Sequence, residues 1–140
     1  MPKSNKRALI SVYHKKGIDK LASALRKNGW EIISTGGTAS YLNSNSIPVT
    51  KVSDITGFPE ILGGRVKTLH PKIFGPILAE NSDAHNKELS DLSLSRIDLV
   101  IVNFYPFEEY LSENADLQTL VEKIDIGGPS MGTAAATNFK

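Results

Sequence analysis

Short runs of aliphatic and β-branched residues alternate with amphipathic segments along this chain, and this alternation constrains the fold more than any other feature. Four runs predict strands, at residues 8–12, 31–34, 47–52 and 97–105. Apolar residues at helical spacing predict a helix after the first run, ending at Asn28-Gly29, and further helices are expected from about Thr38 and from Pro129. Strands separated by helices predict an α/β fold with a mainly parallel sheet covered on both faces. The run at 97–105 is apolar enough to be a central strand.

Composition excludes several classes of protein. The 140 residues, 40% of them hydrophobic, suffice for one domain with its own core. A formal net charge of +1 argues against a nucleic-acid partner. The absence of cysteine excludes disulfides and thiolate metal sites and agrees with a reducing compartment. The sequence has no secretory signal pattern and no apolar run of membrane-spanning length, so we expect a cytoplasmic protein without a membrane partner.

The last twelve residues, "PSMGTAAATNFK", predict a helix after which the sequence ends. An α/β unit normally returns a strand after such a helix. We therefore expect residues 1–140 to be the front part of a longer polypeptide, truncated at the C-terminal end of the domain.

Polar residues follow three of the predicted strands, where ligands bind in open α/β sheets. A Gly-Gly turn flanked by hydroxyl residues follows the second strand and precedes a helix N-terminus, a combination suited to a phosphate. The candidate binding residues are Ser11, Lys15, Ser34, Thr35, Gly36, Gly37 and Thr38, and the polar strand-end residues are Asn103 and Tyr105. Taken one at a time, a Gly-Gly turn after a strand is more often just a turn, and a single lysine such as Lys15 is ordinarily a solvated one. Asn103 and Tyr105 are as consistent with strand-end packing as with a functional role.

A cation-rich stretch, "GGRVKTLHPKIFGP" at residues 63–76, shows little helical or strand character. It contains Arg65, Lys67, His70 and Lys72 and no acid. Further along, Asp125 precedes two glycines and is either a turn former or a functional carboxylate. The three histidines, His14, His70 and His85, lack metal-ligand spacing, so no metal site is expected. Together with the polar strand ends, the cations predict a ligand site at one edge of the sheet.

Several segments resemble one family in order and spacing: "RALISVYHKKGI", "STGGTA", "VSDITGFPEILGGRVKTLHPKI", "DLVIVNFYPF" and "EKIDIGGPSM". The chain resembles the N-terminal IMP cyclohydrolase domain of the bifunctional purine-biosynthesis (PurH) family, whose members also carry aminoimidazole carboxamide ribonucleotide transformylase activity. The resemblance implies a methylglyoxal-synthase-like three-layer α/β sandwich and a homodimer. It also implies closure of the formylated aminoimidazole carboxamide ribotide to IMP with loss of water, without a metal or organic cofactor. A transformylase domain using 10-formyltetrahydrofolate would lie outside this sequence.

The resemblance also implies roles for individual residues. Lys67 would lie at the reacting formyl and carboxamide groups, Arg65, Thr68 and Gly127 would hold the nucleotide, and the glycine cradle would take its 5′-phosphate. Asn103 and Tyr105, with Lys67, would stabilise the formyl oxygen as it gains charge. Asp125 would orient the amide or relay its proton.

The sequence departs from the family pattern at positions that bear on activity. His14 and Lys16 replace an aspartate and a threonine, Phe74 and Pro76 replace a histidine and a glycine, and Thr133 replaces an arginine. Thr137 stands where the family has a lysine beside the substrate base, so a nucleotide site with impaired cyclisation is an alternative. Two other functions share this fold. A methylglyoxal synthase would need a carboxylate base in the pocket, and a regulatory phosphate-binding module would need no chemistry.

Overall fold

A four-stranded sheet forms the centre of the computed structural model, which describes residues 5–140. The strands are β1 (Arg7–Ser11), β2 (Glu31–Ser34), β3 (Thr50–Lys51) and β4 (Leu99–Val102). Their order across the sheet is β3-β2-β1-β4, and each neighbouring pair is parallel. The carboxyl ends of all four strands therefore lie at one edge of the sheet.

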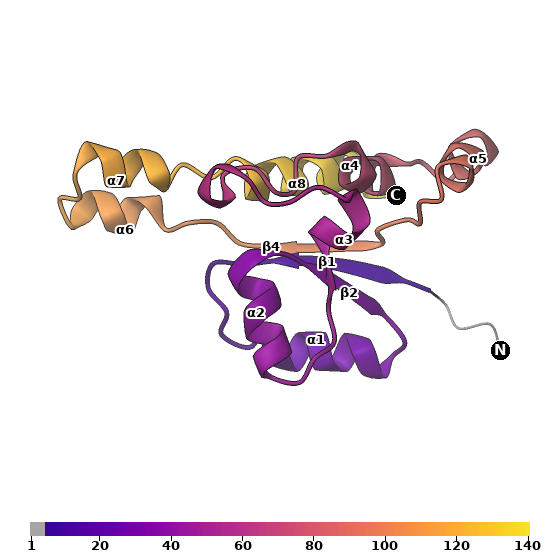
Figure 1. Ribbon diagram of the computed structural model, residues 1–140, viewed down its shortest axis with the longest axis horizontal. Coiled ribbons are helices and arrows are strands. Elements are labelled where there is room, and N and C mark those ends of the chain that lie inside the picture. Colours follow the sequence, from indigo (N-terminus) through magenta and orange to yellow (C-terminus); the bar gives the residue numbers. More distant parts are fainter. Residues whose placement is uncertain (1–4) are drawn as a thin grey trace.

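Helices cover both faces of the sheet (Figure 1). On one face lie α1 (Ile18–Lys27) and α2 (Gly36–Ser44), and on the other lie α3 (Val52–Thr56), α4 (Pro71–Leu78) and α8 (Gly127–Thr137). The connections carry α5 (Asp83–Asp91), the short 3-10 turn η1 (Leu62–Gly64), and α6 (Phe107–Ser112) with α7 (Leu117–Glu122). The last two helices pack together and project beyond the sheet. This arrangement confirms the three-layer α/β sandwich with helices on both faces.

Two hydrophobic cores lie on either side of the sheet because successive side chains of a strand point to opposite faces. Ile10 and Ile32 face α1 and α2, whereas Leu9 and Ile33 face α4 and α8. All four side chains are fully buried, and each such burial contributes about 1.5–3 kcal/mol. The continuous apolar character of the β1 and β2 sequences thus reflects a sheet that is covered on both faces.

The prediction that the segment around 97–105 forms a central strand is wrong. β4 is an edge strand that pairs only with β1 within the described part of the chain, and its residues are half-buried. The central positions belong to β1 and β2. Hydrophobicity indicates that a strand is covered on its faces, whereas strand order depends on pairing with distant segments, which no local pattern records.

Several predicted boundaries also differ. The run at 47–52 keeps only two residues in β3, because the backbone turns into α3 at Val52. The predicted helices at Thr38 and Pro129 each begin two residues earlier, at Gly36 and Gly127. The cation-rich stretch is not devoid of helix, since α4 begins at Pro71, where the fixed φ of proline suits a first helical residue. His70 caps this helix, accepting the Lys72 N–H at its Nδ1 atom at 3.1 Å.

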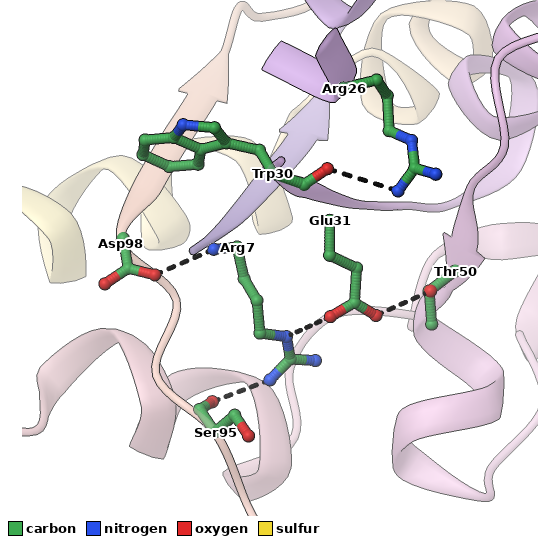
Figure 2. Close-up of polar contacts among 7 residues, drawn as sticks. All are labelled: Arg7, Arg26, Trp30, Glu31, Thr50, Ser95 and Asp98. Atoms are coloured by element: carbon green, nitrogen blue, oxygen red, sulfur yellow. Dashed lines mark hydrogen bonds and ion pairs between the residues drawn. The ribbon is translucent and has the colours of Figure 1, made fainter. Parts of the chain in front are cut away.

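A polar network closes the opposite, amino-terminal edge of the sheet (Figure 2). Arg7 is nearly buried, forms an ion pair with Glu31 at 3.0 Å and donates to the Ser95 carbonyl at 2.7 Å. Its backbone N–H donates to Asp98, and Glu31 accepts the Thr50 hydroxyl hydrogen at 2.7 Å. These contacts join the starts of β1, β2 and β4 to β3. The carboxyl edge of the sheet takes no part in this network.

Candidate functional site

A cavity of about 410 Å³ opens at the carboxyl edge of the sheet. Its walls come from the ends of β1 and β4, the start of α2, the loop after η1, the end of α7 and the first turn of α8. Twelve of the fourteen candidate residues named from the sequence line it: Ser11, Lys15, Thr35, Gly37, Thr38, Arg65, Lys67, Thr68, Asn103, Tyr105, Asp125 and Gly127. The fold thus gathers at one place residues that are more than a hundred positions apart in the chain.

The other two candidates, Ser34 and Gly36, are not among the lining residues. Ser34 is fully buried, and its hydroxyl donates to the Ile10 carbonyl at 2.6 Å, so it joins β2 to β1. Gly36 is the first residue of α2 and adopts φ of 54°, a conformation that favours glycine. It lies at the rim of the cavity, where its N–H donates to a carboxylate.

The start of α2 presents donors toward the cavity. Thr35 is buried, and its hydroxyl donates to Oε1 of Glu60, the same oxygen that accepts the Gly36 N–H at 3.0 Å. Thr38 instead exchanges hydrogen bonds with the backbone of Val12, at 3.1 Å and 3.0 Å. Thr38 therefore fixes α2 against β1, while Thr35 and Gly36 supply donors at the N-terminus of α2 that the Glu60 carboxylate occupies.

Two lysines flank this helix start. A methyl group placed on Gly37 would lie 3.7 Å from the ammonium of Lys15, and one placed on Gly36 would lie 3.1 Å from that of Lys67. Lys15 also donates to the Val12 and Tyr13 carbonyls, which holds it at the end of β1. Glycine at position 36 therefore keeps room for the Lys67 ammonium, whereas a methyl group at position 37 would make only an ordinary contact with Lys15. The two ammonium groups beside the N-terminus of α2 suit an anion.

The loop that carries Lys67 is shaped by a bridge between Ile61 and Val66, whose backbone groups exchange hydrogen bonds of 3.1 Å and 3.4 Å. This bridge closes the loop that contains η1 and holds the next residue, Lys67, over the cavity. Arg65 forms an ion pair with Glu122 at the end of α7. Thr68 is buried next to Gly127, where an added methyl group would lie 3.1 Å from its hydroxyl oxygen.

Asn103 and Tyr105 lie just beyond β4, as the sequence predicted, but Asn103 has a local structural role as well. Its side chain accepts the N–H groups of Tyr13 and His14 and donates to the His14 carbonyl at 2.9 Å. These bonds fix the loop after β1. Tyr105 packs edge-on against Tyr13 at 5.4 Å between ring centroids.

A cluster of three tyrosines encloses one lysine at the rim. The Lys123 ammonium lies 4.7 Å from the ring centroid of Tyr110, 5.5 Å from that of Tyr105 and 6.0 Å from that of Tyr13, within cation–π range. The hydroxyls of Tyr13 and Tyr110 are 2.7 Å apart. This hydrogen bond, more than any other effect, raises the pKa of Tyr13 above its ordinary value of 10.0.

Asp125 caps the first turn of α8, where one carboxylate oxygen accepts the Gly128 N–H at 3.0 Å. The pattern "IDIGGP" explains this geometry, because glycines shortly after an aspartate permit close approach of side chain and backbone.

Two of the positions where the sequence departs from the family pattern, Thr133 and Thr137, lie further along α8. Both are exposed, and their hydroxyls donate to carbonyls of the preceding turn, at Pro129 and Thr133.

Sequence reasoning missed several residues of the site. Glu60 and Glu122, both acids, contact the proposed binding groups Thr35 and Arg65. Tyr13, Gly63, Gly64 and Met131 also line the cavity. The family-like segment "TGFPE" includes Glu60, but nothing in its local pattern indicates that the carboxylate reaches α2.

The described residues form neither a metal-binding cluster nor a membrane-spanning helix. Between residues 5 and 140, no group of three or more histidine or acidic side chains is arranged to hold a metal ion. Of the helices in this range, none combines the length and apolarity needed to cross a membrane.

Comparisons with known proteins place these features in context. Residues 17–130 match the MGS-like domain family. The chain is 56% identical over 137 residues to the bifunctional purine biosynthesis protein PurH of Caldicellulosiruptor saccharolyticus, covering 96% of this chain and 27% of that protein. The chain is also 56% identical over 134 residues to PurH of Aquifex aeolicus, which covers 95% of this chain and 26% of that protein. The crystal structure of ForH aligns with a TM-score of 0.81 and 36% identity, over 97% of this chain and 70% of that one. The chain thus spans about a quarter of the length of its PurH relatives.

Proposed function

Because this chain belongs to the MGS-like family, and within it to the N-terminal domains of the bifunctional purine biosynthesis enzyme PurH, we propose that it is an IMP cyclohydrolase. Its substrate would be the formylated aminoimidazole carboxamide ribotide and its product IMP. One observation carries the proposal. The cavity joins an anion-suited helix start, flanked by Lys15 and Lys67, to the polar groups of Asn103, Tyr105 and Asp125.

The first part of the proposed mechanism is binding. The 5′-phosphate takes the donors at the start of α2 beside Lys15. Arg65, Thr68 and Gly127 hold the rest of the nucleotide, and Lys67 serves the reacting formyl and carboxamide groups. Binding in this way brings the carboxamide nitrogen against the formyl carbon. Proximity of this kind supplies about 7–11 kcal/mol in the best cases, which matters here because an amide nitrogen is a poor nucleophile.

Ring closure then forms a bond between the carboxamide nitrogen and the formyl carbon. Asp125 orients the amide and accepts the proton that the nitrogen loses. The formyl oxygen gains negative charge, is stabilised by Lys67, Asn103 and Tyr105, and takes up the proton that the carboxamide nitrogen lost, which makes it a hydroxyl group. This hydroxyl group takes a second proton and departs as water, and the neighbouring nitrogen loses its hydrogen to balance that second proton. The new carbon–nitrogen double bond completes the aromatic ring. Each reacting atom is balanced without a metal, an oxidant or an organic cofactor.

A direct assay tests this function. The chain is incubated with the formylated ribotide and IMP is measured by chromatography, beside a Lys67→Ala variant and a blank without protein. Removing one donor from a developing oxyanion lowers turnover by about 10²–10³-fold. Lys72→Ala is the matched control, because Lys72 is an exposed cation from the same stretch that does not line the cavity. Equal loss in both lysine variants, or no IMP above the blank, would contradict the proposal. Methylglyoxal formed from dihydroxyacetone phosphate would favour a synthase instead.

The alternative is a nucleotide- or phosphate-binding module of the same fold with impaired chemistry. The observation that favours it is Thr137, which cannot supply the charge of the lysine found in the family. Thr137→Lys separates the two functions. If IMP binds to the original chain and is formed only by the variant, the original chain is a binding module; if both form IMP at similar rates, Thr137 is tolerated.

The partner and the location are proposals that rest on the family resemblance. We propose a cytoplasmic homodimer. The apolar side chains that α6 and α7 expose, among them Leu111 and Leu117 at 56% and 78%, support an additional protein contact there. Sedimentation of the original chain and of Leu117→Glu tests this proposal. If the dimer forms through α6 and α7, the sedimenting mass should fall twofold in the variant. A monomeric original chain would contradict it.

A further inference from the structure

The donors assigned to the nucleotide phosphate hold a carboxylate of the same chain. Thr35 and Gly36 both donate to one oxygen of Glu60, the Gly36 N–H at 3.0 Å. Glu60 comes from the loop between α3 and η1, more than twenty residues from these donors in sequence. Its carboxylate thus has the placement and the charge that a phosphate oxygen would have at the start of a helix.

The positive charge near Glu60 exceeds the single negative charge of its carboxylate. A methyl group placed on Gly36 would lie 3.1 Å from the Lys67 ammonium and 3.9 Å from Oε1 of Glu60, so both side chains reach the same point. Lys15 lies beside the adjacent Gly37. Two hydrogen-bond donors therefore hold one negative charge, with the Lys67 ammonium near the same glycine and the Lys15 ammonium beside the next one. A phosphate carries close to two charges at neutral pH and offers more acceptor oxygens, so it satisfies this environment more completely.

We propose that Glu60 is an internal competitor for the phosphate of the nucleotide and thereby sets the affinity of the site. The inference rests on the proposed function for the identity of the ligand. Two anions do not share the same donors at hydrogen-bond distance, because like charges repel strongly there. Phosphate binding displaces Glu60 from Thr35 and Gly36. The side chain of Glu60 is exposed, so its carboxylate can move into water without disturbing either core.

Competition by Glu60 and a purely structural role of Glu60 predict different effects on ligand affinity. If Glu60 only capped α2, removing its charge would weaken the helix start and lower the affinity for every ligand of the cavity. As a competitor, Glu60 lowers the affinity only for ligands that carry a phosphate. Inosine, which has the base and ribose of IMP without the phosphate, separates these roles.

The test is calorimetric titration of IMP, inosine and inorganic phosphate into the original chain, Glu60→Gln and Glu60→Ala, with thermal unfolding of each protein. Glu113→Gln is the matched control, because it removes one exposed carboxylate that lies between α6 and α7 and not at the start of α2. We expect both Glu60 variants to bind IMP and phosphate about tenfold more tightly, the factor that corresponds to one charge-assisted hydrogen bond. The affinity for inosine should stay unchanged, and Glu113→Gln should match the original chain.

The outcomes separate this inference from the proposed function. Unchanged or weaker phosphate and IMP binding in folded Glu60 variants overturns the competition, even if the original chain forms IMP. Tighter binding of phosphate in the variants upholds it, even if no protein forms IMP. If none of the proteins binds phosphate or IMP, the competition and the proposed nucleotide site both fall. Two substitutions at Glu60 are used so that a folding defect in one leaves the other decisive.

Discussion

The guanidinium of Arg65 forms an ion pair with the carboxylate of Glu122, and both side chains line the cavity. The pair joins the loop after η1 to the end of α7, more than fifty residues further along the chain. Both side chains are about half exposed, at 59% and 46%. An ion pair in this setting contributes little to stability, but it neutralises a cation that we assign to nucleotide binding.

Releasing Arg65 from this pair should strengthen nucleotide binding. We expect Glu122→Gln to tighten IMP binding several-fold, while the free energy of unfolding changes by less than about 1 kcal/mol. Arg65→Ala should weaken the same binding. Calorimetric titration and thermal unfolding measure both effects. Weaker binding in Glu122→Gln would mean that Glu122 orients Arg65 for the ligand, which is the opposite of our expectation.

Replacing either of two glycines of α8 by alanine should change the stability of the protein, and the two changes should have opposite signs. A methyl group at the buried Gly128 would lie 2.9 Å from the Asp125 carboxylate and 3.1 Å from the Phe104 ring. Gly128→Ala should therefore destabilise the fold by about 1–3 kcal/mol and move Asp125. At Gly132 the nearest atom, from Val102, is at 3.8 Å, so alanine should stabilise the helix by about 0.5–1 kcal/mol. Denaturant unfolding of both variants tests the pair, and equal effects would contradict the packing described for Gly128.

The pKa of Tyr13 should fall toward 10.0 in Tyr110→Phe, because the hydrogen bond between the two hydroxyls is the largest cause of its rise. A raised pKa means that the folded state favours the neutral phenol. The resulting stabilisation is present below pH 10.0 and is lost as the pH rises through the folded pKa. Ultraviolet titration of tyrosinate measures the change. Tyr41→Phe, which removes a tyrosine outside the cluster, is the matched control and should leave the Tyr13 transition in place.

Asp116 should stabilise α7 in a pH-dependent way. Its carboxylate accepts the Thr119 N–H at 2.7 Å, and this bond holds the pKa of Asp116 below its ordinary value of 3.8. The stabilisation is therefore fully present above pH 3.8 and is lost as the pH falls through the lower folded pKa. Unfolding of the original chain and of Asp116→Ala from about pH 6 to pH 2 should show a stability difference that closes on acidification. A difference that persists at the acid end would contradict the assignment.

Sequence reasoning predicted most of the candidate site because its residues lie in short local patterns at strand ends. Lys15 and Asn103 follow from such a pattern and Lys67 from the cation-rich stretch, and the fold brings all three to one cavity. Ser34 fits the same pattern, yet its hydroxyl bonds to the neighbouring strand. No local rule distinguishes a hydroxyl that faces a ligand from one that faces Ile10, since the choice depends on which strand lies beside it.

The sequence by itself determined the α/β class, the presence of α1, α2 and α8 and the identity of the polar edge, because hydrophobic period, capping residues and glycines act over a few neighbouring positions. Only the tertiary structure decided that β4 lies at an edge, that Asn103 fixes the loop after β1, and that Glu60 reaches the donors of α2. These are contacts between segments 24 or more residues apart. They depend on how the two cores pack against the sheet, and such packing is a property of the whole chain.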